Sequence, residues 1–191
     1  MPAKFAFEMP VAALSREQEA IEHYQDSRTD AAFEALFRAL CPRLLLYFTV
    51  RGCDAGVAED LTQNVMLNVY RHSGMVRDRS LFRAWVLRIA HNELVQHWKR
   101  LGRQVQTIDL DSCTAALLER AATHPGGCAV EFAEAMEQLL PQERQVILLR
   151  YVEQLEYREI AAVLEVPIGT VQWRAFVARR KMAGYFRRRV V

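Results

Sequence analysis

The chain has few of the residues that break helices or form tight turns: its 191 residues include only eight glycines and six prolines. β-Hairpins depend on glycine-rich turns and on strands of alternating polarity. Such alternation is hard to find here, and apolar residues instead recur every three or four positions, which is the helical period. The sequence therefore predicts an all-α fold.

Cysteine is scarce and irregularly spaced. The four cysteines are Cys41, Cys53, Cys113 and Cys128, and no two of them form a Cys-x-x-Cys pair. Cys113, His124 and Cys128 match no zinc-ligand spacing. We therefore expect ordinary thiols in a reducing compartment, with no metal and no cofactor.

Motifs typical of enzymes and membrane proteins are also missing from the sequence. There is no glycine-rich phosphate loop, no nucleophile elbow and no His-Glu-x-x-His helix, so no catalytic site can be identified. No apolar run approaches the roughly 20 residues that a membrane span needs, and the first residues lack the apolar core of a signal peptide. These absences predict a cytoplasmic protein that is not an enzyme.

A first compact helical domain is expected at residues 30–100. Apolar stripes of helical period run from Asp30 to Phe48, from about Val57 to His72, and from Leu81 to about Arg100. We expect Asp30 and Ser80 to cap the first and third of these helices. Residues 1–29 form a weakly patterned, acidic N-terminal extension.

A flexible linker is expected at residues 101–129, where polar and turn-forming residues interrupt any sustained period. Fully extended, such a linker could span up to about 100 Å. A second helical domain is expected at residues 130–191, with Pro141 suited to the first turn of a helix. The predicted architecture is two small helical domains joined by a flexible linker.

The second domain contains the pattern of a helix-turn-helix motif, because two short apolar stripes flank a three-residue break at 165–167. The stripes consist of Ile160, Ala161 and Leu164 before the break and Val171, Ala175 and Ala178 after it. Residues 166–191 carry seven bases and no acid, whereas residues 131–165 carry eight acids and three bases. The second helix of such a motif enters the DNA major groove, and a local basic surface suits phosphates.

Two separate blocks resemble the extracytoplasmic-function (ECF) group of bacterial RNA polymerase sigma factors, within the sigma-70 superfamily. The first block is AEDLTQNVMLNVY at residues 58–70, followed by FRAWVLRIAHN at residues 82–92. The second begins with LPQERQVILLRY at residues 140–151 and continues into the helix-turn-helix with GTV at 169–171. The resemblance covers about residues 30–100 and 131–187. Both blocks in one short chain are far more specific than a helix-turn-helix alone.

This resemblance implies an alternative sigma factor that binds core RNA polymerase and directs promoter-specific transcription initiation. In that family the first domain binds the β′ clamp and reads and melts the −10 element of promoter DNA. The second domain binds the β flap and reads the −35 element. Control by an anti-sigma factor, often membrane-tethered, is common in the family and is expected here.

Carried over residue by residue, the resemblance assigns three sets of contacts. The polymerase-binding residues are Asp60, Gln63, Asn64 and Leu67. The −10 DNA-binding residues are Arg83, Arg88, Asn92, Lys99 and Arg100. The −35 DNA-binding residues are Thr170, Gln172, Trp173, Arg174, Phe176, Val177, Arg179, Arg180 and Lys181. In the major groove Gln suits adenine, Arg suits guanine, and an aromatic ring can meet a thymine methyl.

Two tryptophans could receive a base extruded during melting, namely Trp85 and Trp98. Trp85 shares its stripe with Phe82 and Ile89, which favours a position in the core.

Some positions depart from the family pattern. Glu165 stands where a turn glycine is usual, which predicts a strained or re-aimed turn. Gln172-Trp173 replaces a basic-small pair, Val177 replaces an arginine, and Gln96 replaces an aspartate in the first domain.

Two other classes of function remain compatible with the residues alone. A stand-alone helix-turn-helix regulator would need residues 30–100 to serve as its dimerisation or effector domain, and a polar helix rich in Asn and Gln is an unusual dimer seam. A purely structural helical adaptor would not require a basic segment without acids.

Overall fold

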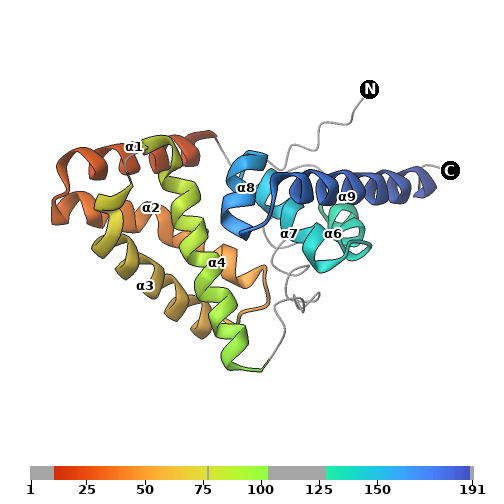
Figure 1. The fold of residues 1–191 in the computed structure, drawn as a ribbon, viewed down its shortest axis with the longest axis horizontal. Helices are drawn as coiled ribbons and strands as arrows, with labels where there is room; N and C mark the ends of the chain where they lie inside the picture. The colour runs from red at the N-terminus through yellow and green to blue at the C-terminus, as the bar shows by residue number, and fades with distance from the viewer. Residues whose placement is uncertain (1–10, 77, 103–127, 190–191) are drawn as a thin grey trace.

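The computed structural model describes residues 11–76, 78–102 and 128–189, and these residues are helical almost throughout (Figure 1). No residue within these ranges belongs to a β-strand, so the all-α prediction is confirmed for the part of the chain that is described. The predicted linker lies almost wholly outside the described residues, as do Cys113 and His124.

The first helical group consists of α1 (Val11–Ser27), α2 (Asp30–Thr49), α3 (Ala55–His72) and α4 (Phe82–Arg100). Each helix packs on the next in chain order. Two 3₁₀ turns, Ser73–Met75 and Arg79–Leu81, connect α3 to α4. Most of the N-terminal extension therefore forms α1, whose Ile21 and Tyr24 are buried in the same core.

The residues that cap the helix starts are not the two that were predicted, Asp30 and Ser80. Thr29 rather than Asp30 caps α2, because its Oγ1 accepts a hydrogen bond from the Ala32 N–H at 3.3 Å. Asp78 caps the 3₁₀ turn before α4 by accepting from the backbone N–H and the hydroxyl of Ser80. Ser80 is thus a donor inside that turn, and α4 begins two residues later without a side-chain cap.

The second helical group consists of α6 (Cys128–Glu137), α7 (Pro141–Ile147), a π-helical turn (Leu148–Val152), α8 (Tyr157–Leu164) and α9 (Ile168–Arg189). Pro141 occupies the first turn of α7, as predicted. The Glu143 carboxylate accepts a hydrogen bond at 2.9 Å from the Leu140 N–H, which the start of α7 leaves without a helical partner.

Helices α8 and α9 form the predicted helix-turn-helix. They meet at 109° across the break at 165–167, within the range of about 90–120° that is typical of the motif. Glu165 adopts the left-handed conformation there, with φ 54° and ψ 41°. Ile160 and Leu164 of α8 and Val171 of α9 are buried in the same apolar cluster.

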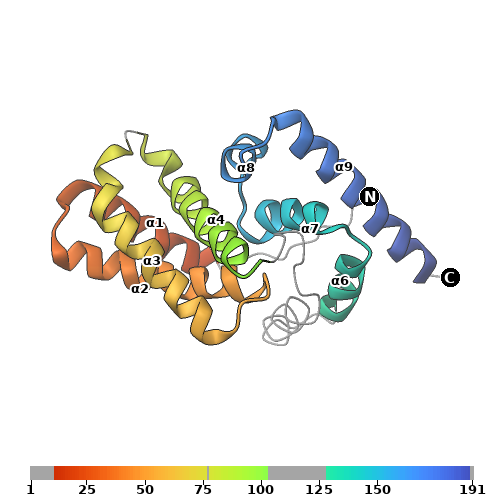
Figure 2. The same cartoon turned by 60° about the horizontal axis from the view of Figure 1, so that its bottom comes forward.

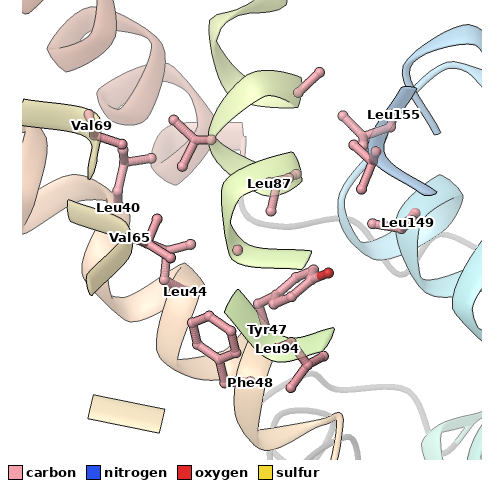
Figure 3. Packing of buried hydrophobic residues seen from close by; sticks show 14 of the residues in the cluster. Leu40, Leu44, Tyr47, Phe48, Val65, Val69, Leu87, Leu94, Leu149 and Leu155 are labelled. Atoms are coloured by element: carbon pink, nitrogen blue, oxygen red, sulfur yellow. The ribbon is translucent and has the colours of Figure 1, made fainter. Parts of the chain in front are cut away.

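The two helical groups pack against each other along α4 and α8 (Figure 2). One apolar cluster runs through both groups, and Leu87 of α4 lies opposite Leu149 and Leu155 of the second group (Figure 3). We call this contact the packed arrangement.

Among the described residues, no single helix is long and apolar enough to cross a membrane. The bent pair α8–α9 meets the limits of length and composition only when its two helices are taken together.

Candidate polymerase and nucleic-acid interfaces

One face of α3 is polar and exposed although the helix is well packed on its other side. Leu61, Val65 and Val69 are buried against α2 and α4. The exposed face carries the four predicted polymerase-binding residues, namely Asp60, Gln63, Asn64 and Leu67. Leu67 is 51% exposed, so this face offers an apolar anchor among hydrogen-bonding groups.

The predicted −10 residues all lie on α4 but divide into two sets. Lys99 and Arg100 are exposed at its C-terminal end, and Asn92 is half-buried. Arg83 and Arg88 instead reach across to the second helical group. In the packed arrangement two of the five predicted −10 residues are thus engaged by protein.

Four charged side chains meet where α1, α2 and α4 face the end of the π-helical turn, and we call them the buried charge cluster: Glu17, Arg43, Arg83 and Glu153. Arg43 Nε donates to Glu153 Oε2 at 2.5 Å, and Arg43 Nη1 donates to Glu17 Oε2 at 2.8 Å. Arg83 donates to the Glu153 carbonyl oxygen and lies 3.4 Å from the Glu17 carboxylate. Two carboxylates and two guanidinium groups balance in formal charge.

Burial and charge pairing oppose each other in this cluster. Glu17, Arg43 and Glu153 are each no more than 5% exposed. Burial raises the pKa of Glu17, and the neighbouring Arg43 only partly offsets that rise. Burial acts to lower the pKa of Arg43, but the carboxylates of Glu153 and Glu17 outweigh it and raise that pKa. The pairing therefore holds Arg43 charged inside the protein.

Two further polar contacts join the groups. Arg88 Nη2 donates to Glu165 Oε1 at 2.8 Å, with both side chains about half exposed. Gln145 Nε2 and His91 Nδ1 lie 3.2 Å apart. Burial, followed by the charge of Arg51, lowers the pKa of His91 to about 4, so this imidazole is neutral in the packed arrangement at neutral pH.

Arg51 is a buried cation at the end of α2. Its guanidinium lies 3.6 Å from the centroid of the Tyr47 ring, and Nη1 donates to the Tyr47 carbonyl oxygen at 2.8 Å. Its Nε and Nη2 have no hydrogen-bond partner among the described residues. Burying a charge with so few partners is unfavourable by several kcal/mol.

The recognition helix α9 presents its predicted −35 residues on several faces. Gln172, Trp173, Phe176, Arg179 and Arg180 are exposed on the side away from the core. The half-buried residues are Thr170, Arg174, Val177 and Lys181. Val171, Ala175 and Ala178 face inward and are buried. The exposed set forms a continuous outward face at helical spacing.

Lys181 has a partner that the sequence did not indicate. Its ammonium group lies 2.7 and 2.9 Å from the two carboxylate oxygens of Glu143, which is itself only 5% exposed. Because Glu143 also holds the start of α7, this contact ties α9 to α7.

The two tryptophans of α4 lie in or beside the core. Trp98 is 7% exposed, and Trp85 is half-buried with its ring centroid 5.6 Å from that of Phe82. The helical stripe that favoured a core position for Trp85 agrees with this contact. Gln96 is exposed on the same helix.

The buried charge cluster was not foreseen from the sequence. Its members are separated by up to 136 positions, and no local pattern links Glu17 or Arg43 to Glu153. A charged residue such as Arg43 within the apolar stripe of α2 was the one available signal, since a lone charge in a buried position needs a partner.

Comparison with protein families gives two matches that together span both helical groups. Residues 36–104 match the sigma-70 region 2 model, and residues 129–182 match the sigma-70 region 4 model.

Two relatives match most of the chain. The ECF RNA polymerase sigma-E factor of Escherichia coli (strain K12) is 30% identical over 145 residues, which cover 68% of this chain and 73% of that protein. The RNA polymerase sigma-H factor of Pseudomonas aeruginosa is 32% identical over 143 residues, which cover 66% of this chain and 71% of that protein.

Two solved structures share the fold. CnrH, in complex with the cytosolic domain of CnrY, aligns with a TM-score of 0.59 at 22% identity over 90% of this chain and 97% of that one. The sigma factor RpoE of Bartonella quintana, in complex with the anti-sigma factor NepR, aligns with a TM-score of 0.58 at 22% identity over 81% of this chain and 96% of that one.

Proposed function

Because the chain belongs to the ECF group of the sigma-70 family of RNA polymerase sigma factors, we propose that it binds core polymerase and directs promoter-specific initiation. It is an alternative sigma factor, and members of this family are initiation factors rather than enzymes. The observation that carries the proposal is that one chain combines the exposed polar face of α3 with the exposed recognition face of α9. Each face lies within one of the two matched regions.

The domain of residues 30–100 binds the β′ clamp through the exposed face of α3. Asp60, Gln63 and Asn64 offer hydrogen bonds to a partner helix, and Leu67 supplies apolar contact. This face is too polar to pack in a core, and its mixture of polar groups with Leu67 suits a partner that is itself partly polar.

The same domain reads the −10 element with α4, and the domain of residues 130–191 binds the β flap and reads the −35 element with α9. Residues 101–129 link the two. Lys99 and Arg100 are accessible in the packed arrangement, whereas Arg83 and Arg88 contact Glu153 and Glu165. Reading of the −10 element by all of α4 therefore requires the two domains to part.

An anti-sigma factor, membrane-tethered or free, holds this chain in the packed arrangement and covers the α3 face. Two solved structures of this fold support the idea, since their titles name CnrY and the anti-sigma factor NepR as partners of the sigma factors in them. The released factor acts in the cytoplasm, because RNA polymerase and promoter DNA are there. An inhibitor of this kind should co-purify with the factor from uninduced cells, and constitutive activity without one would argue against this control.

The test of the proposed function is reconstitution. Purified chain should co-elute with core RNA polymerase in gel filtration and should produce new transcription start sites on genomic DNA. A stand-alone helix-turn-helix regulator would bind DNA without polymerase and would not co-elute. Absence of factor-dependent start sites, with co-elution also absent, would overturn the proposal.

A further inference from the structure

The outward face of α9 carries two large aromatic side chains in contact with each other. Trp173 is 65% exposed and Phe176 is 50% exposed. Their ring centroids lie 6.0 Å apart with the rings inclined by 30°, a stacked geometry. Neither ring contributes to the core, because the inward positions are taken by Val171, Ala175 and Ala178. An exposed apolar pair of this size commonly marks a binding surface.

The surroundings of the pair indicate a polyanionic partner. Residues 166–191 carry seven bases and no acid. Arg179 and Arg180 are exposed one turn further along α9, and neither forms a salt bridge with any described residue. Since the first turns of a recognition helix enter the groove while basic residues further along it meet phosphates, the aromatic pair is placed to face base edges rather than backbone.

Duplex DNA offers only one apolar group to such a pair. The flat faces of the bases are stacked in the duplex, and the major-groove edges carry hydrogen-bonding groups except for the C5 methyl of thymine. Successive base pairs are separated by about 3.4 Å along each strand. Two rings with centroids 6.0 Å apart therefore reach over neighbouring base pairs.

We propose that Trp173 and Phe176 are the specificity-determining pair of the −35 contact and select thymine methyl groups at two neighbouring positions. The proposal rests on the proposed function, because it requires α9 to lie in the major groove. Gln172 is exposed beside the pair and offers its amide to an adenine. The preferred −35 element then contains two close thymines next to an adenine on one strand or the other.

The experiment removes the methyl groups and nothing else. The preferred promoter is first selected from a library randomised over the −35 region, using polymerase holoenzyme. Each thymine of the selected site is then replaced singly by deoxyuridine, which lacks the C5 methyl. We expect two positions at which deoxyuridine weakens holoenzyme binding about fourfold, the factor that burial of one methyl-sized group supplies.

Variants assign the effect to the pair. The quantity compared is the ratio of holoenzyme affinity for DNA with thymine to its affinity for DNA with deoxyuridine at one position. With Trp173→Ala or Phe176→Ala, this ratio should fall to about one at one of the two positions. With Arg180→Ala, affinity should fall on all promoters while that ratio stays unchanged. Circular dichroism and co-elution with core polymerase should be unaltered, because both rings are exposed.

The possible outcomes distinguish failure of the inference about Trp173 and Phe176 from failure of the proposed function. Normal promoter binding with no methyl-sensitive position would overturn the inference and leave the proposed function standing. Loss of polymerase co-elution in Trp173→Ala, with unchanged DNA preference, would make the pair a protein-docking surface and would also overturn it. Absence of any factor-dependent promoter binding would instead remove the proposed function itself.

Discussion

Arg43 of α2 and Glu153 of the second helical group form a buried ion pair across the contact between the groups, with Arg43 Nε 2.5 Å from Glu153 Oε2. Glu153 also accepts a hydrogen bond from Arg83 through its carbonyl oxygen. Glu153 thus contributes to the docking of the second helical group and also binds Arg83, an arginine of the proposed −10 surface. Under the proposed function, promoter reading therefore competes with interdomain docking for Arg83.

Glu153→Gln should loosen the packed arrangement. The substitution keeps the shape of the side chain but removes the charge that Arg43 faces, and loss of one partner from a buried ion pair costs about 3–5 kcal/mol. We expect a lower free energy of unfolding by chemical denaturation and a larger radius of gyration in solution scattering. Binding of single-stranded −10 DNA should rise, because separation of the two helical groups takes Arg83 away from the Glu153 carbonyl oxygen.

The matched control is Glu156→Gln in the same domain. The Glu156 side chain is 71% exposed and pairs with Arg150 at 2.9 Å, and exposed pairs contribute about 0–1 kcal/mol. Equal changes in both variants would show that the buried charge cluster has no special part in docking.

Glu165→Gly should stabilise the second domain. Glu165 has φ 54°, a left-handed conformation that is unfavourable by about 1–2 kcal/mol for residues with a Cβ and that glycine adopts freely. Its exposed pair with Arg88 contributes little. Glycine should therefore raise the free energy of unfolding by up to about 1 kcal/mol.

Glu165→Ala is the comparison for that variant, since it removes the same ion pair but keeps the Cβ. It should be no more stable than the natural chain. If Ala and Gly raised stability equally, the gain would come from losing the carboxylate and not from relief of the backbone.

The same position illustrates how far sequence reasoning reaches. The break at 165–167 and the stripes around it predicted the motif, because a helix-turn-helix depends on neighbouring residues. The strained turn at Glu165 was expected from the family resemblance, since a glycine is usual at that position. The stripe of Leu61, Val65 and Val69 likewise predicted which face of α3 is exposed. Local patterns of this kind repeat with the helical period and are readable without a structure.

Contacts between distant segments could not be read in that way. The buried charge cluster brings Glu17 to Arg43 and both to Glu153, and none of these pairings follows from periodicity. The pairing of Lys181 with Glu143 is similar, since a basic residue in a basic segment suggests phosphate and not a carboxylate of another helix. The helix caps at Thr29 and Asp78 were missed by one or two residues, the usual uncertainty of helix ends.

Acidification should destabilise the fold through His91. Its pKa is about 4 in the folded chain because burial and the charge of Arg51 disfavour the imidazolium, against a usual value near 6.5. Between these values the unfolded chain binds a proton that the folded chain does not, so stability falls as pH drops from about 6.5 towards 4. The full loss is roughly 3 kcal/mol.

The measurement is the free energy of unfolding at pH 7 and pH 5. His91→Asn retains a polar group beside Gln145 but cannot titrate, so it should flatten the difference between the two pH values. His72→Asn alters an exposed histidine of α3 and should leave the difference unchanged. Equal flattening by both substitutions would remove His91 as the cause.

Asp60→Ala together with Asn64→Ala should weaken binding to core polymerase without altering the fold. Both side chains project from α3 on the side opposite the buried Leu61, Val65 and Val69. Affinity for core polymerase and circular dichroism are the two measurements. Glu59→Ala changes another exposed residue of α3 that is outside the proposed contact and serves as the control. Unchanged affinity in the double variant would move the contact elsewhere.

Neighbouring basic residues of α9 should behave differently when each is changed to alanine. Arg180 is exposed and forms no salt bridge with a described residue, so it is free to meet phosphate. Arg180→Ala should weaken binding about equally on all promoters. The slope of the logarithm of the binding constant against the logarithm of salt concentration should become shallower by roughly one, as expected for the loss of one phosphate contact.

Lys181→Ala should instead act through the fold. It leaves the carboxylate of Glu143, only 5% exposed, without its ammonium partner, and an under-satisfied buried group costs about 1–3 kcal/mol. We expect a lower free energy of unfolding and a salt dependence that changes by much less than one unit. Lys181→Arg, which keeps a cation beside Glu143, should restore most of the stability. If Lys181→Ala instead lowered the salt dependence as much as Arg180→Ala at unchanged stability, Lys181 would leave Glu143 for phosphate when DNA binds. The contact between α7 and α9 would then not depend on this ion pair.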